Sequence, residues 1–257
     1  MNRLVLITGA SSGIGQALSA RYYQAGYSLA LVARRTSEIA SWASQSGLDA
    51  ACYRIYGADV SVPESMIAAG RACIAAQGLP DVVIANAGIS VGVDTAERED
   101  LDLMALTFAT NNVGMAATFH PFIRAMATRR SGTLVGIASV AGVRGLPGHG
   151  AYCASKAAVI SYCESLRGEL RADGVKVVTI CPGYIDTPLT RKNRYAMPFL
   201  MPAQDFADKA YAAIHAKASY RVIPWQMGMV AKLLRSLPNA LFDKIMAGQP
   251  RKPRRGQ

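Results

Sequence analysis

The feature that most constrains the fold is a glycine-rich turn near the start of the chain. An apolar run, Leu4–Thr8, leads into Gly9-Ala-Ser-Ser-Gly13-Ile-Gly15, and a helical pattern continues to Ala25. Glycines let a backbone approach a phosphate closely, and a helix N-terminus offers free N–H groups and a favourable dipole. The spacing G-x-x-x-G-x-G therefore predicts a dinucleotide pyrophosphate site. Ordinary loops and tight helix-to-strand packing also use such glycines, so this alternative stays open.

The turn opens a series of short aliphatic runs that alternate with longer helical segments. This pattern is typical of repeated βαβ units, so we predict an α/β fold with a doubly wound (Rossmann) parallel sheet of about seven strands, flanked by helices. The expected strands are residues 4–8, 28–33, 51–56, 82–85, 132–138, 176–180 and 220–224. The expected helices are residues 14–25, 62–77, 98–129, 152–173 and 203–217.

We predict one domain from these elements. Residues 1–224 form its dinucleotide-binding and catalytic part, 225–249 a C-terminal amphipathic helical extension, and 250–257 a flexible basic tail. Hydrophobic residues make up 51% of the chain and charged residues 18%, which favours a large packed core over disorder.

The location of the protein is expected to be cytoplasmic. The first apolar run stops at Gly9, too early for the core of a signal peptide, and no apolar run reaches the length of a membrane span. Five cysteines form an odd number without a C-x-x-C pair, so we expect small buried thiols in a reducing compartment and no metal site.

The net charge of +11 raises the question of a polyanionic partner. Four of the basic side chains, those of Arg251, Lys252, Arg254 and Arg255, lie together in the tail, and no nucleic-acid-binding motif accompanies them. We therefore expect no nucleic-acid partner.

The second predicted strand ends in Arg34-Arg35, where a site that prefers NAD would carry an acidic residue for the ribose hydroxyls. Guanidinium groups suit the additional phosphate of NADP, because they are planar, permanently charged and bidentate. The predicted cofactor is NADP(H), with NAD as the less favoured choice. A solvated basic pair after a strand is the alternative interpretation.

Tyr152 and Lys156 are four residues apart on a predicted helix, so both side chains lie on one face. A free tyrosine has a pKa of about 10, and a neighbouring cation would stabilise its phenolate near neutral pH. The pair by itself is common in sequences. The pair becomes more specific because Ser139 lies at the end of a predicted strand and Asn111 lies in a predicted helix.

The order of these motifs resembles that of the short-chain dehydrogenase/reductase superfamily, in its short single-domain type. The resemblance covers residues 1 to about 224. It rests on TGASSGIG (8–15), Asp59-Val60, NAG (86–88), NNVG (111–114), Ser139, YCASK (152–156) and PGYIDT (182–187).

The resemblance implies that Tyr152 is the catalytic acid or base, Lys156 its cationic partner and a holder of the nicotinamide ribose, Ser139 a donor to the substrate oxygen, and Asn111 the holder of a relay water. It also implies cofactor contacts from Gly9, Ser11, Ser12, Gly13, Ile14, Gly15, Arg34, Arg35, Asp59, Val60, Asn86, Ala87, Gly88, Tyr152, Lys156, Pro182, Gly183, Ile185 and Thr187. Taken singly, each of these residues could equally be a cap, turn or packing residue.

The expected activity is NAD(P)-dependent oxidoreduction, with NADPH-dependent reduction of an apolar ketone or aldehyde favoured. The loop 183–202 carries Leu189, Tyr195, Met197, Phe199, Leu200 and Met201, which suit either a substrate lid or core packing. His149 suits either a substrate contact or an ordinary loop position. The substrate and the direction in the cell stay open.

A redox sensor or scaffold without turnover is the alternative, and four catalytic residues argue against it. Sugar-nucleotide epimerases need a larger C-terminal domain than this chain holds. We expect a homodimer or homotetramer formed through the helices that contain Asn111 and Tyr152. The segment 225–246, with Trp225, Met229 and Leu233, is expected to pack on the domain or on a partner subunit, ahead of a peripheral membrane contact.

Overall fold

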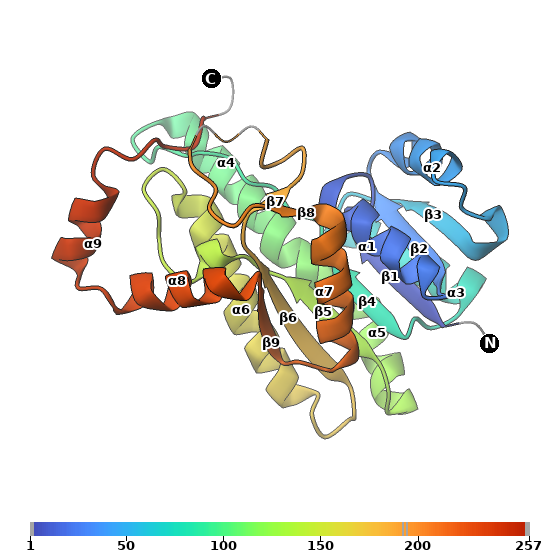
Figure 1. The fold of residues 1–257 in the computed structure, drawn as a ribbon. Coiled ribbons are helices and arrows are strands. Elements are labelled where there is room, and N and C mark those ends of the chain that lie inside the picture. Colours follow the sequence, from blue (N-terminus) through green and yellow to red (C-terminus); the bar gives the residue numbers. More distant parts are fainter. Residues whose placement is uncertain (1–2, 192, 194, 255–257) are drawn as a thin grey trace.

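The computed structural model describes residues 3–191, 193 and 195–254. Its centre is a parallel sheet of seven strands in the order β3-β2-β1-β4-β5-β6-β9 (Figure 1). The strands are β1 (Leu4–Thr8), β2 (Ser28–Ala33), β3 (Tyr53–Gly57), β4 (Val82–Ala85), β5 (Thr133–Ile137), β6 (Lys176–Pro182) and β9 (Tyr220–Ile223). The predicted doubly wound α/β fold is confirmed.

Helices cover both faces of this sheet. They are α1 (Gly13–Gln24), α2 (Thr36–Gln45), α3 (Pro63–Gln77), α4 (Arg98–Phe108), α5 (Gly114–Arg129), α6 (Gly150–Glu169), α7 (Ala203–His215), α8 (Trp225–Ser236) and α9 (Asn239–Met246). Short 3-10 turns lie at Ala50–Cys52 and Val140–Gly142, and a second, two-stranded sheet joins β7 (Ile185–Asp186) to β8 (Met201–Pro202).

The inner strands β1, β4 and β5 are buried along their whole length, as the unbroken aliphatic runs predict, whereas the edge strands β3 and β9 carry exposed residues. On β1, Leu6 packs into the core under α3, α5 and α6, whereas Val5 and Ile7 pack into the core under α1, α2 and α7. Complete burial of one such side chain contributes about 1.5–3 kcal/mol. The two cores together hold the sheet between its helical layers.

The chain reverses its direction of winding at β1. After β1, β2 and β3 it returns to place β4 on the other side of β1. The connections on either side of this point leave a crevice at the carboxyl ends of the strands, which is where open α/β sheets bind ligands.

The segment 98–129, predicted as one helix, is interrupted. Ala109–Val113 form a π-helical turn between α4 and α5. Such a turn inserts one extra residue and re-aims the side chains around it, which periodicity in the sequence does not reveal. Asn111 lies within it.

Two further elements differ from the expectation. The strand predicted at 51–56 begins only at Tyr53, because Asp49 accepts a hydrogen bond from the Ala51 backbone N (2.9 Å) and caps a 3-10 turn there. Helix α2 was not predicted. Its sequence is rich in serine and threonine, which disfavour the interior of a helix. Ile39 and Ala43, four residues apart and both buried, are the one pair with helical spacing on its inner face.

The C-terminal extension forms two helices that lie at the opposite end of the molecule from α2 (Figure 1). Met227 and Ala231 of α8 face inward, but Trp225, Met229 and Leu233 are 62–65% exposed. These three residues therefore do not pack on their own domain, because the inward stripe of α8 is offset from them by two residues, and their packing on a partner subunit stays a prediction.

The described part of the basic tail, residues 250–254, lies against the body of the domain. Gly92 N donates to Pro253 O (3.2 Å), and Arg254 Nε lies 2.6 Å from Asp100 Oδ2. The predicted flexibility of the tail stays a prediction, and Arg255 lies outside the described residues. Among the helices described, none combines the length and the apolar character that crossing a bilayer requires.

Candidate active site

A cleft of about 420 Å³ opens at the carboxyl ends of β1, β2, β4 and β5, and we call it the first cleft. It is lined by Gly9, Ser11, Ser12, Gly13, Ile14, Ala33, Arg34, Arg35, Ala58, Asp59, Val60, Asn86, Ala87, Gly88, Ile89, Thr110, Ile137, Ala138, Ser139, Tyr152, Lys156, Pro182, Gly183, Ile185, Thr187, Pro188, Leu189 and Thr190. Residues spread over 182 positions of the chain thus share one space. All predicted site residues line it except Gly15 and Asn111.

The glycine turn at the base of the cleft has the backbone that the sequence predicts. Gly9 and Gly13 have φ values of +69° and +53°, a region that side chains disfavour. A Cβ at Gly9 would lie 2.9 Å from Ala87 Cα, and one at Gly13 would lie 3.1 Å from Thr187 Cβ. Helix α1 begins at Gly13, so its first N–H groups face this cradle. A pyrophosphate fits here.

Asn86 holds the turn in place from the neighbouring strand. Its Nδ2 donates to Thr8 O (2.9 Å), while the Thr8 hydroxyl accepts hydrogen bonds from the backbone N of Asn86 and of Ala87 (3.1 Å each). These bonds join the ends of β1 and β4. Asn86 therefore shapes the cleft floor besides lining it.

Two arginines and one carboxylate stand at the end of the cleft beyond β2. Arg34 Nη1 lies 3.5 Å from Asp59 Oδ2, and Arg35 is paired with Glu38 (3.1 Å). Desolvation alone would raise the pKa of Asp59, but hydrogen bonds from Ser61 and the nearby Arg34 lower it below its ordinary value. Both guanidinium groups are more than half exposed, which leaves donors for an additional phosphate.

Tyr152 and Lys156 lie near the start of α6, on the face directed into the cleft. Lys156 Nζ donates to Ile137 O (2.8 Å) and lies 5.9 Å from the centre of the Tyr152 ring. Burial raises the pKa of Tyr152 to about 12, against a lowering hydrogen bond from Ser139. Burial also lowers the pKa of Lys156 to about 8. In the protein alone, Ser139 rather than Lys156 is the neighbour that lowers the Tyr152 pKa.

Asn111 is enclosed behind Lys156 and does not line the cleft. It is 1% exposed, its Oδ1 accepts from Ile89 N (2.8 Å), and its Nδ2 donates to Ile89 O (3.0 Å) and to Ser155 Oγ (2.9 Å). A Cβ added at Gly88 would lie 3.1 Å from Asn111 Oδ1 and 3.5 Å from Lys156 Nζ. Asn111 therefore joins the π-helical turn, α6 and the loop after β4 directly beside the lysine.

Gly15 is also absent from the lining. It belongs to the second half of the motif and packs against the carbonyl group of Gly9, where any side chain would clash. Its contribution is the close approach of α1 to β1.

A second cleft, of about 360 Å³, joins the first at Ser139, Tyr152, Gly183, Leu189 and Thr190. It is mainly apolar. The segments that enclose it are residues 139–149, the loop after β7, α8, the end of α9 and the tail. Sequence reasoning did not assign α8, α9 or Lys252 to the site, because no local motif marks residues that meet only through the fold.

The loop after β7 divides into parts with different surroundings. Leu189 lines both clefts and Tyr195 lines the second, whereas Met201 packs on the sheet core and Phe199 and Leu200 are about half exposed. The predicted apolar set is therefore only partly gathered over the site. His149 contacts Tyr195, Nε2 to the hydroxyl (3.3 Å), and lines the second cleft.

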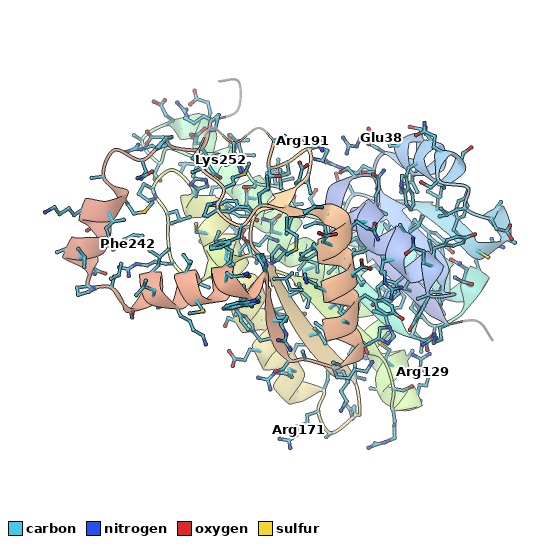
Figure 2. All side chains as sticks on the ribbon, in the orientation of Figure 1. Glu38, Arg129, Arg171, Arg191, Phe242 and Lys252 are labelled. Atoms are coloured by element: carbon cyan, nitrogen blue, oxygen red, sulfur yellow. The ribbon has the colours of Figure 1, made fainter. Side chains whose placement is uncertain are left out.

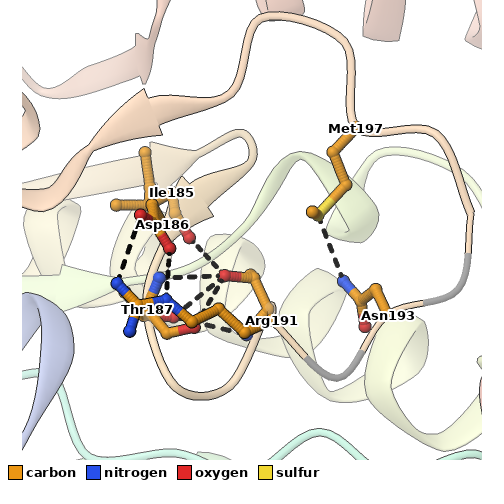
Figure 3. A network of polar contacts seen from close by, with 7 residues as sticks. Ile185, Asp186, Thr187, Arg191, Asn193 and Met197 are labelled. Atoms are coloured by element: carbon orange, nitrogen blue, oxygen red, sulfur yellow. Dashed lines mark hydrogen bonds and ion pairs between the residues drawn. The ribbon is translucent and has the colours of Figure 1, made fainter.

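A polar network fixes the first part of this loop (Figure 3). Thr187 N donates to the hydroxyl of Thr190 (3.0 Å), which also bonds to Ile185 O, and Arg191 Nε lies 2.7 Å from Asp186 Oδ1. Met197 Sδ accepts from Asn193 further along (3.6 Å). These bonds hold Thr187 at the wall of the first cleft.

Comparison with known proteins agrees with this architecture. The short chain dehydrogenase family matches residues 3–197. An uncharacterized oxidoreductase of Myxococcus xanthus is 35% identical over 241 residues, which cover 94% of this chain and 95% of that protein.

Solved structures show the same fold. A short chain dehydrogenase/reductase from Burkholderia phymatum in complex with NAD has a TM-score of 0.81 at 24% identity, covering 90% of this chain and 92% of that one. A short-chain dehydrogenase from Sphingobium yanoikuyae in complex with NADPH has a TM-score of 0.77 at 23% identity, covering 93% and 97%.

Proposed function

Because this chain belongs to the short-chain dehydrogenase family, we propose that it reduces an apolar ketone or aldehyde with NADPH and that Tyr152 donates the proton. The observation that carries the proposal is the junction of the two clefts. Tyr152 and Ser139 stand where the first cleft, with its glycine cradle, meets the mainly apolar second cleft.

The residues of the first cleft fit a nicotinamide dinucleotide. The cradle of Gly9 and Gly13 would hold the pyrophosphate, and Asp59 and Val60 would flank the adenine. Lys156 would hold the nicotinamide ribose, and Thr187 its carboxamide. The bound cofactor would supply the hydride.

Protonation states in the site suit reduction. A Tyr152 pKa of about 12 keeps the phenol protonated at neutral pH, so it can donate to the oxygen of the carbonyl as negative charge develops there. Ser139 lies at the same junction and can donate a second hydrogen bond to that oxygen. Lys156, whose pKa burial lowers to about 8, is still mostly charged at neutral pH, so with cofactor and substrate bound it would supply a positive charge on the same face of α6 as the phenolate left behind.

Arg34 and Arg35 support the choice of NADP(H) over NAD. Both line the cleft beyond β2, and their guanidinium groups offer several donors where the 2′-phosphate would lie. A solved relative was crystallised with NADPH and another with NAD, so both cofactors fit this fold. The arginines of this chain favour the first.

Tyr152→Phe tests the mechanism. The variant loses the proton donor and keeps the ring, so turnover of a carbonyl substrate should fall about 10²–10⁴-fold. The dissociation constant for NADPH, followed by nicotinamide fluorescence, should change less than threefold. Tyr162→Phe, on the exposed side of the same helix, is the matched control. Turnover within tenfold of the wild type would exclude Tyr152 as the acid, and NADPH binding without turnover of any carbonyl compound would point to a redox sensor.

A further inference from the structure

The second cleft contains positive charges without a balancing carboxylate. Among its described lining residues there is no aspartate or glutamate, while Arg144, His149 and Lys252 all line it. A cation in a mostly apolar pocket is costly unless it is paired, so the partners of these three side chains decide whether a charge in the cleft is left uncompensated.

The guanidinium group of Arg144 has its partners within the protein. It donates to Leu234 O, to Leu237 O (2.8 Å) and to Asn239 Oδ1 (3.1 Å), and its guanidinium lies 3.8 Å from the centre of the Phe242 ring. The partial negative charge of the α8 C-terminus balances it. Arg144 therefore has a structural role.

His149 is uncharged near neutral pH. Burial lowers its pKa, although the hydrogen bond that the ring donates to the Pro147 carbonyl acts in the opposite direction, and the nearby ammonium of Lys252 lowers the pKa further. Its two ring nitrogens contact Pro147 O (3.2 Å) and the Tyr195 hydroxyl (3.3 Å). His149 therefore leaves no charge to be balanced.

Lys252 differs from both. Its Nζ donates to the hydroxyl of Ser90 (2.7 Å), a neutral group, and no ion pair joins it to a carboxylate among the residues that the structure describes. The side chain is partly buried, and desolvation lowers its pKa to about 8. One of its donors is thus occupied and its charge is not compensated.

The fold positions this ammonium group. Gly92 N donates to Pro253 O, and a Cβ at Gly92 would lie only 2.7 Å from that oxygen. Two residues after Lys252, Arg254 is paired with Asp100, which is 3% exposed. Figure 2 shows Lys252 at the same end of the molecule as the loop that carries Arg191. These contacts fix the tail directly after Lys252, whose side chain lines the second cleft.

The ammonium group also lies beside the reacting centre. Lys252 Nζ is 5.9 Å from the centre of the Tyr152 ring, the same distance as Lys156 Nζ. One small molecule can therefore contact Lys252 and the Tyr152 hydroxyl together.

We propose that Lys252 binds an anionic group of the substrate, so that the substrate is an apolar oxo acid whose carboxylate meets Lys252 while its carbonyl meets Tyr152. This inference rests on the proposed carbonyl reduction and names its substrate class. A carboxylate would accept a charge-assisted hydrogen bond from Nζ, and the hydrocarbon part would contact Met227, Ala231 and Leu234 of α8.

Binding of unreactive probes tests the site without turnover. Hexanoate and hexanamide share size and shape but differ in charge, and both are titrated calorimetrically into the protein saturated with NADPH. We expect hexanoate to bind at least tenfold more tightly than hexanamide. Equal binding of the two probes to the wild-type protein would overturn the proposal without the use of any variant.

Lys252→Met removes the charge and keeps the length of the side chain. It should weaken hexanoate binding at least tenfold and leave hexanamide unchanged, whereas Lys252→Arg should stay within threefold of the wild type. Lys232→Met, an exposed lysine of α8, is the control. Unchanged hexanoate binding in Lys252→Met would refute the role of Lys252.

Kinetics then separate a binding role from an effect on Tyr152. For 4-oxohexanoate and its methyl ester, Lys252→Met should raise KM for the acid at least tenfold and change neither kcat nor the pH profile for the ester. A shifted pH profile with the ester would instead make Lys252 a positioning residue for Tyr152 and overturn the proposal. If neither compound is turned over but hexanoate still binds through Lys252, the carbonyl reduction fails and the anion site stands.

Discussion

Arg35 Nη2 donates a hydrogen bond to the hydroxyl of Ser11, over 3.3 Å, and so connects the end of β2 to the glycine turn after β1. Arg34, the preceding residue, lies 3.5 Å from Asp59 at the end of β3. Both guanidinium groups thus belong to the lining of the first cleft, and each is held by a residue that follows a neighbouring strand.

This arrangement predicts selective loss of NADPH binding in Arg34→Ala and Arg35→Ala. Hydrogen bonds to charged groups contribute about 1.5–3 kcal/mol, so each variant should bind NADPH about 10–100-fold more weakly. NADH lacks the 2′-phosphate, so its dissociation constant should change less than threefold. Titration by nicotinamide fluorescence measures both. Arg54→Ala, on the exposed side of β3, serves as the control, and equal weakening for NADH and NADPH would contradict the phosphate assignment.

The lowered pKa of Lys156 predicts that the folding stability of the protein depends on pH. Its pKa in the folded protein is about 8, below the ordinary value of 10.5, so the unfolded chain binds more protons between these values. Folding stability therefore rises with pH from about 8 to 10.5 on account of this group. Below pH 8 its burial costs up to about 3 kcal/mol.

Lys156→Met should therefore lose activity without losing stability at pH 7. Removal of the charge offsets the loss of the hydrogen bond to Ile137 O, which costs about 1–3 kcal/mol. The melting temperature of the variant relative to the wild type should be highest at pH 7 and should fall between pH 8 and 10. Differential scanning fluorimetry at several pH values measures this difference. A difference that is independent of pH would show that the lysine is not destabilised by burial.

The contacts of Arg144 with α8 and α9 predict that its replacement loosens the C-terminal extension locally. Loss of its bonds to the carbonyl groups at the end of α8 and of its contact with Phe242 leaves polar groups without a partner, a cost of about 1–3 kcal/mol. In Arg144→Met, hydrogen exchange of residues 225–246 should become faster while the sheet stays protected. Arg235→Met, at an exposed position of α8, should leave the exchange unchanged. Unaltered protection in Arg144→Met would mean that the extension does not depend on this residue.

Exposed apolar residues on α4 and α6 bear on the oligomeric state. Leu101, Met104 and Tyr162 are 37–43% exposed, and α4 packs beside α6. We expect a homodimer or homotetramer through this surface, since apolar patches on a helical face commonly mark protein interfaces.

Light scattering checks the expected assembly. The wild-type protein should have at least twice the mass of one 27.3 kDa chain, and a Leu101→Glu, Met104→Glu double variant should shift toward the monomer. Leu241→Glu on α9 is the control. A monomeric wild type would remove this surface from consideration.

The sequence by itself determined the fold class and the first cleft. Strands 4–8, 28–33 and 82–85 have the predicted bounds, because strands buried on both faces are continuous apolar runs. The cradle at Gly9 and Gly13 was also predictable, since a turn that requires positive φ needs glycine wherever it occurs. Each of these signals lies within about a dozen neighbouring residues.

The tertiary structure alone decided the second cleft. Ser90 and Lys252 meet although 162 residues separate them, and Arg144 meets Asn239 across 95. No periodicity or motif connects such positions, because their contact depends on how the loops and the tail pack after the sheet has formed. The π-helical turn at Asn111, which contacts α6, likewise has no counterpart in the periodicity of the sequence. The glycine cradle of the first cleft is thus encoded locally, whereas the second cleft is assembled from segments that only the folded chain brings together.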